Sequence, residues 1–186
     1  MRDRRAESLR GAVPDATTST ILKTSMNKIE SPTTPISIVG WREWLSLPEL
    51  RIPGIKAKVD TGARSSALHT HDFELFERDG GEWVSFHLHP LPRTNRVLLS
   101  CEAPVLGFRE VKDSGGHLEN RPFIHTKARI GAHEWEIDIS LTNREGMKFR
   151  MLLGREALAG GFLVNPSTSY LIGKSLYHEY RSKPAQ

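Results

Sequence analysis

Alternation of apolar and polar residues over most of the chain is the feature that most limits how it can fold. In "WVSFHLH" (83–89), Val84, Phe86 and Leu88 share one face of an extended chain. In "WEIDISL" (135–141), four apolar residues share one face and two acidic residues share the other. Because side chains at positions i and i+2 of a strand point the same way, this period of two predicts half-buried β-strands.

The remaining segments extend this pattern and add one helix. "IKAKV" (55–59), "RVLLSCEAPV" (96–105) and "RPFIHTKARI" (121–130) are further strand candidates, separated by turn residues. "GREALAGG" is typical of a helix, with a short turn over Glu156 to Leu158 that the glycine pair ends. The sequence therefore predicts a mostly β fold, a small barrel or sandwich with hairpins and one short helix near its end.

The length of 186 residues fits one domain with polar extensions. Residues 1–36 are rich in Ser, Thr, Pro and charge and carry no apolar period, so we expect a disordered N-terminal extension. The folded domain is expected over 37–176 and a tail over 177–186. Met26 opens "MNKIESPTTPIS" and is an alternative start to Met1.

Cysteine usage and charge bound the compartment and the partners. The one cysteine, Cys101, excludes an internal disulfide and lies in an apolar strand, where a thiol is usually inert packing. No apolar run could span a membrane, and no apolar stretch follows the N-terminal arginines, so we expect a cytoplasmic protein. The net charge of +4 favours acidic partners, but the lack of a dense basic run argues against nucleic acid.

Asp60, Thr61 and Gly62 follow the strand "IKAKV" directly and allow two interpretations. Asp and Gly are ordinary turn residues. Alternatively, the loop holds a catalytic carboxylate. The chain has no G-x-S-x-G elbow, no phosphate-binding glycine loop, no H-E-x-x-H and no cysteine pair, so we expect neither a nucleotide or other cofactor nor a metal. His87 and His89 fit a polar outer strand face, whereas His69 and His71 lie just beyond the Asp60 loop.

Three motifs together resemble a known family. "AKVDTGARSSALH", "MKFRMLLGREAL" and "FLVNPSTSYLIGK" are similar to a bacterial family of retropepsin-like aspartic endopeptidases, which is also catalogued as ATP-dependent zinc proteases and is related to retroviral-type aspartic proteases. The resemblance covers about Ile38 to Lys174. It implies a small closed acid-protease barrel with one short C-terminal helix and a flap hairpin at "VKDSGGHLENRPF". Since no nucleotide or zinc motif is present, the residues favour the aspartic name.

The resemblance also implies the roles of individual residues. Asp60 would activate the attacking water, Thr61 would hydrogen-bond across a pair of loops, and Gly62 would let the loops approach closely. The other residues it implicates are Ala63, Arg64, Ser114, Gly115, Gly116 and His117 for binding the substrate, and Leu153, Gly154 and Arg155 for supporting the loop. Catalysis of this kind needs two carboxylates sharing one proton.

The chain offers one such loop, because Asp113-Ser114-Gly115 fits the tip of the flap better than a second catalytic loop. The second aspartate must then come from another chain, and the resemblance implies a homodimer.

Arg64 stands where retroviral enzymes commonly carry an acidic residue. With Lys58, Arg121 and Arg144 nearby it would make a basic cleft, which suggests an acidic, Glu-rich peptide or protein substrate. The bacterial family is discussed alongside ligases that add glutamate tails to proteins. By analogy with the family, this chain would remove such tails. Two alternatives stay open. One is a zinc-dependent peptidase using His69, His71 and His117, and the other is a non-catalytic dimeric module that binds acidic tails or ribosomal surfaces.

Overall fold

The computed structural model describes residues 36–92, 94–112, 115–143, 148–159 and 161–180. By its contacts the chain divides into two units, Met1–Thr33 and Thr34–Gln186, and every described residue belongs to the second. The expected disorder of the N-terminal extension falls on 1–35, outside the described residues. None of the described helices is long and apolar enough to cross a membrane.

Strands dominate the described residues, as the alternation predicts. The elements in chain order are β1 (Ser37–Gly40), β2 (Arg42–Leu47), β3 (Ile52–Asp60), β4 (Ser66–His69), β5 (Asp72–Arg78), β6 (Gly81–Leu88), β7 (Leu99–Lys112), β8 (Leu118–Ile130), β9 (His133–Thr142), β10 (Met151–Gly154), α1 (Arg155–Leu158), β11 (Phe162–Asn165) and the 3-10 helix η1 (Tyr177–Tyr180).

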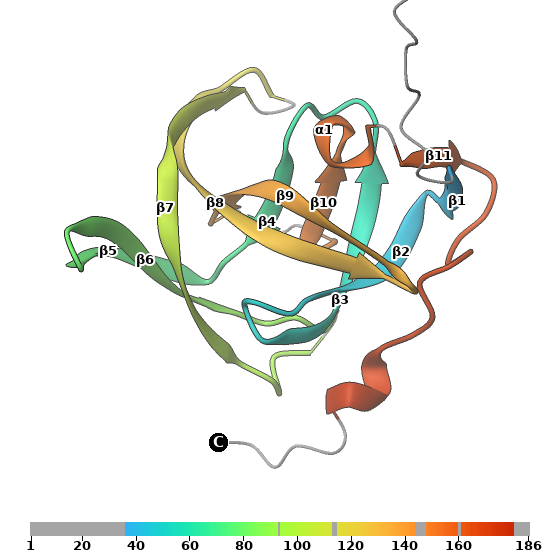
Figure 1. Ribbon diagram of the computed structural model, residues 1–186, viewed down its shortest axis with the longest axis horizontal. Coiled ribbons are helices and arrows are strands. Elements are labelled where there is room, and N and C mark those ends of the chain that lie inside the picture. Colours follow the sequence, from blue (N-terminus) through green and yellow to red (C-terminus); the bar gives the residue numbers. More distant parts are fainter. Residues whose placement is uncertain (1–35, 93, 113–114, 144–147, 160, 181–186) are drawn as a thin grey trace, which may run out of the picture. The chain divides into compact units, whose positions relative to one another are not determined.

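Six strands close into a barrel in the order β2-β3-β10-β4-β9-β8, and a pairing of Ser46 with Arg129 joins β8 back to β2. β7, β6 and β5 continue the sheet beyond β8, with β5 at the free edge (Figure 1). β1 and β11 form a separate parallel pair. The expected small closed barrel with one short helix is confirmed, and the helix begins at Arg155, one residue earlier than the sequence indicates.

The barrel core contains the residues that the period of two assigned to it. Val84, Phe86 and Leu88 of β6 are buried, and so are Ile137 and Ile139 of β9. These apolar faces pack into one cluster with residues from β3, β4 and β10. The strand faces predicted to be apolar are therefore those that stabilise the fold.

Cys101 and Glu43 are both buried, and the Glu43 carboxylate joins two segments of the chain. The Cys101 thiol lies in the core, where burial raises its pKa to about 12, so it is the inert packing residue that its strand predicted. Glu43 is fully buried, and its carboxylate accepts hydrogen bonds from the backbone N–H groups of Gly40, Leu171 and Gly173 at 2.7 to 2.9 Å. These bonds fasten the segment after β11 to the start of β2.

Candidate active site

The loop after β3 places Asp60 where a barrel strand ends. Ile55, Ala57 and Val59 of β3 point into the core, so Lys58 and Asp60 lie on the opposite face of the strand. The Ala63 N–H donates to the Asp60 carbonyl at 3.2 Å and closes the turn. Thr61 and Gly62 are exposed, while the Asp60 side chain keeps 26% of its surface exposed. The turn thus fixes the backbone of Asp60, while its carboxylate remains partly exposed.

Lys58 is the ion-pair partner of Asp60. Its Nζ donates to Asp60 Oδ2 at 2.9 Å. This hydrogen bond is the main reason that the pKa of the Asp60 carboxyl is lowered; partial burial opposes it, while the Lys58 charge and the backbone amides of Gly62 and Ala63 add to it. Asp60 is therefore held as a carboxylate. The sequence indicated Lys58 as a cation of the cleft, but not this contact.

The segment formed by β10 and α1 holds the loop from about ninety residues away in sequence. β10 runs parallel to β3, with the buried Leu153 opposite Val59 and Gly154 opposite Asp60. In Figure 1 both strands point to the top of the view, where α1 follows β10.

Hydrogen bonds from this segment reach the backbone of Thr61, Ala63 and Arg64 and the side chain of Ser66. Arg155 N–H donates to the Ala63 carbonyl at 2.8 Å, and its guanidinium donates to the Thr61 carbonyl at 2.8 Å. Glu156 N–H donates to the Arg64 carbonyl at 3.0 Å. Gly154 N–H donates to Ser66 Oγ at 3.1 Å. Arg155 therefore contacts the Asp60 loop directly, as well as opening α1.

Gly154 has no room for a side chain. A Cβ atom there would lie 2.3 Å from the Ser65 carbonyl oxygen and 2.9 Å from that of Arg64. Because both neighbours are backbone, Gly154→Ala must push β10 away from the loop, and we expect a loss of about 3 kcal/mol of unfolding free energy. Thermal unfolding measures it, and Gly161→Ala is the control, since a Cβ there meets no described atom within 4 Å. Equal melting temperatures for the two variants would contradict the proposed close packing.

Gly62 is different, because the described part of a single chain leaves room beside it. A Cβ atom at Gly62 would meet Asp60 Oδ1 at 3.4 Å, an ordinary contact, and its φ angle is not among the positive ones. The close approach that the sequence suggested for Gly62 was between two loops, so a second chain would have to supply it. That expectation stays a prediction.

Arg64 projects from the loop and pairs with Glu156 of α1. The Arg64 Nε to Glu156 Oε1 distance is 2.7 Å, and the Arg64 side chain is 81% exposed. The other cations expected in the cleft differ in placement: Arg121 is buried on β8 beside Glu119, and Arg144 lies outside the described residues. The cations that the described chain places on the Asp60 loop or in contact with it are thus Lys58, Arg64 and Arg155.

The expected flap is a hairpin of β7 and β8. The two strands pair down to Lys112 opposite Leu118, and Gly116 in the turn has a φ of +89°, which glycine adopts without strain. Gly115, Gly116 and His117 are exposed in this turn, while Ser114 lies outside the described residues. The hairpin curves toward the top of Figure 1, the end of the view at which β3 and β10 finish.

The histidines of the metal alternative lie in three different environments. His69 is buried on β4, His71 is exposed with its ring 6.0 Å from that of His89, and His117 is in the flap turn. Within the described ranges, no group of three or more His, Cys, Asp or Glu residues could hold a metal ion.

A closed β-barrel whose Asp-Thr-Gly loop is supported by a parallel strand and a short helix defines the class of retropepsin-like folds. The family model described as "Retropepsin-like aspartic endopeptidase RimB" (RimB-like) matches residues 38–175, and the chain belongs to this family. The resemblance drawn from the three sequence motifs is therefore confirmed.

Curated relatives contain a similar segment within longer chains. A "Probable alpha-L-glutamate ligase" of Shewanella halifaxensis (strain HAW-EB4) is 44% identical over 137 residues, which is 74% of this chain and 30% of the relative. A protein with the same name from Parasynechococcus marenigrum (strain WH8102) is 46% identical over 136 residues, which is 73% of this chain and 29% of the relative. The chain thus spans less than a third of these relatives.

A solved structure shares the fold over nearly its whole length. The crystal structure of Lpg0085, a protein of unknown function (DUF785) from Legionella pneumophila subsp. pneumophila str. Philadelphia 1, matches with a TM-score of 0.61 and 27% identity. The match covers 73% of this chain and 97% of that one.

Proposed function

We propose that this chain is an aspartic-type peptidase, in which two copies bring their Asp60 carboxylates together to activate water for peptide-bond hydrolysis. The observation that carries the proposal is the position of Asp60: a partly exposed carboxylate on a loop whose backbone is fixed by β10 and α1. Membership of the retropepsin-like family supports the same chemistry.

The reaction needs two carboxylates and one proton. Two carboxylates about 3 Å apart do not both ionise readily, so the pair retains one proton over its working range of pH. The ionised carboxylate takes a proton from water, the water oxygen attacks the peptide carbonyl carbon, and the protonated carboxyl donates to the carbonyl oxygen. One chain supplies one of these groups in its Asp-Thr-Gly loop, so the proposal requires a homodimer.

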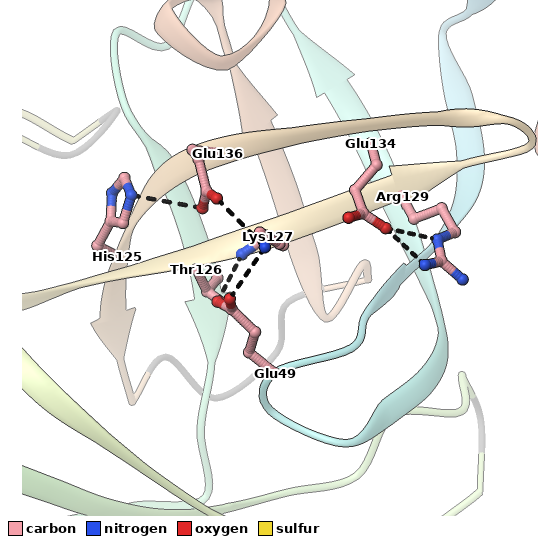
Figure 2. Close-up of polar contacts among 7 residues, drawn as sticks. All are labelled: Glu49, His125, Thr126, Lys127, Arg129, Glu134 and Glu136. Atoms are coloured by element: carbon pink, nitrogen blue, oxygen red, sulfur yellow. Dashed lines mark hydrogen bonds and ion pairs between the residues drawn. The ribbon is translucent and has the colours of Figure 1, made fainter.

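The charges around the loop favour an acidic substrate. Lys58 pairs with Asp60 itself, Arg64 pairs with Glu156, and Arg155 donates to the Thr61 carbonyl, so three cations meet two carboxylates at this loop. The face formed by β8 and β9 differs: Lys127 lies 3.8 Å from both Glu49 and Glu136, and Arg129 pairs with Glu134, so two cations meet three carboxylates there (Figure 2). An excess of positive charge therefore lies at the Asp60 end.

The names of the relatives support the same substrate class. They are named for ligation of L-glutamate, and ligation forms the kind of amide bond that a peptidase hydrolyses. We propose Glu-rich polypeptide segments as the substrate of this chain. We propose that the chain meets these substrates in the cytoplasm, because a reducing compartment keeps a single cysteine in its thiol form.

The proposed specificity is tested by comparing fluorogenic Glu-rich peptides with neutral ones of equal length. We expect the wild type to cleave Glu-rich peptides faster, with the preference falling as salt increases, because exposed charges are screened over about 8 Å at physiological ionic strength. Arg64→Ala should reduce the preference. Arg129→Ala is the matched control, because Arg129 forms a comparable exposed pair with Glu134 (Figure 2). Arg129 lies opposite Ser46 of β2, away from the Asp60 loop.

The other outcomes separate the alternatives. Equal cleavage of both peptides by wild type and Arg64→Ala would contradict the acidic preference. Binding of Glu-rich peptides without any turnover would favour the non-catalytic module. Near-stoichiometric zinc in the purified protein, together with inhibition by chelators, would favour the metal peptidase.

A further inference from the structure

Lys58 lies two residues before Asp60, and this spacing places both side chains on the same face of β3. The result is a direct contact between Lys58 Nζ and Asp60 Oδ2 at 2.9 Å. The contact is partly shielded, since the carboxylate keeps only 26% of its side-chain surface exposed. A cation thus lies on an oxygen of the carboxylate to which the proposed function gives the chemistry.

The buried Glu43 carboxylate of β2 accepts hydrogen bonds from backbone N–H groups, and the other cations on the elements around this part of β3 have partners of their own. Lys56 of β3 lies over the rings of Trp44 and Tyr170, and Arg42 of β2 donates to Ser169 and stacks on Trp41. Arg64 of the loop pairs with Glu156 of α1, and Arg155 of α1 donates to the Thr61 carbonyl. On β10, the residues opposite Lys58 and Asp60 are Leu152 and Gly154, which carry no charge. Lys58 is therefore the cation that the described structure pairs with Asp60.

A cation in this position changes the pH at which a pair of carboxylates loses its last proton. The active form of the pair carries one proton, and the last proton leaves at a pH set by the repulsion between the two ionised groups. A cation on each carboxylate offsets part of that repulsion and stabilises the fully ionised, inactive form. The last proton is then lost at lower pH than it would be without the cations.

We propose that Lys58 is a positioning residue for Asp60, which holds the carboxylate by its Oδ2 atom and sets the upper pH limit at which the pair keeps its proton. The proposal rests on the proposed function for its effect on turnover, but not for its effect on the Asp60 carboxyl itself. The direction agrees with the lowered pKa of the Asp60 carboxyl, for which the Lys58 hydrogen bond is the largest cause.

The first test needs no substrate. The full chain is labelled with ¹³C at aspartate carboxyl carbons, the Asp60 signal is assigned by its absence in Asp60→Asn, and the signal is followed by NMR as pH changes. We expect Asp60 to titrate at higher pH in Lys58→Met than in the wild type, because methionine keeps an unbranched side chain only one atom shorter and removes the cation. Lys58→Arg should titrate as the wild type does. An Asp60 signal that titrates at the same pH in Lys58→Met and the wild type would overturn the proposal.

The second test measures kcat/KM for a Glu-rich peptide as a function of pH. We expect the alkaline limb of the profile to move to higher pH in Lys58→Met and to stay in place in Lys58→Arg. A merely structural role for Lys58 would lower the whole profile without moving the limb, and that result would count against the proposal. If no variant hydrolyses any peptide while the NMR shift is present, the proposed function fails and the role of Lys58 toward Asp60 stands.

Discussion

Replacement of Asp60 by asparagine is expected to abolish peptide hydrolysis while leaving the fold intact. Asparagine keeps the shape of the side chain but can neither take a proton from water nor share one with a second carboxylate. The loss of general acid–base chemistry alone is expected to lower kcat by about 10² to 10⁴-fold. The measurement is turnover of a Glu-rich peptide at equal concentrations of folded wild type and variant.

The fold of the Asp60→Asn variant is checked separately by circular dichroism and thermal unfolding. Because the Lys58–Asp60 pair is partly exposed, its loss should change the unfolding free energy by no more than about 1 kcal/mol. Asp138→Asn is a matched control, since Asp138 is also a partly exposed aspartate, hydrogen-bonded to Arg109 and His125 on the barrel wall. A folded Asp60→Asn variant that retained most of its activity would remove the aspartic mechanism.

The strands of this barrel could be predicted because their signal is local. In β6 and from Ile55 onward in β3 the buried residues follow the period of two, since each strand has one face toward the core. In β9 the period ends at Ile139, after which Ser140, Leu141 and Thr142 are all buried. α1 was predictable for a similar reason, because glycines bound it on both sides. β7 is longer than its apolar run because its second half, beyond an irregularity between Val105 and Gly107, pairs with β8 in the flap and is largely exposed.

The contacts that build the site are of two kinds. The Lys58–Asp60 pair follows from strand geometry, because residues two apart share a face, so alternation alone contained its signal. The bonds from Gly154 to Ser66 and from Arg155 to Thr61, and the pairing of Arg64 with Glu156, join residues that are about ninety positions apart. No local pattern encodes such pairings, because they depend on β10 entering the barrel between β3 and β4.

The active unit is expected to be a dimer in which Asp60 of one chain meets Asp60 of its partner. One Asp-Thr-Gly loop per chain cannot supply two carboxylates, and in the described part of one chain a Cβ atom at Gly62 would meet Asp60 Oδ1 alone, at an ordinary contact distance of 3.4 Å. Specific activity per chain should therefore fall toward zero as the protein is diluted below its dimer dissociation constant. Sedimentation velocity at the same concentrations shows whether loss of activity follows loss of the dimer.

Mixing with an inactive partner tests the same point at a fixed total concentration. If wild type and Asp60→Asn chains exchange freely in equal amounts, roughly a quarter of the dimers contain two wild-type chains, so activity per wild-type chain should fall to about half. Asp138→Asn, which keeps Asp60, should cause no such loss. A protein that sediments as a monomer at its working concentration, yet keeps full specific activity, would contradict the shared pair. The catalytic partner of Asp60 would then have to be Asp113, which lies outside the described residues, or a metal ion.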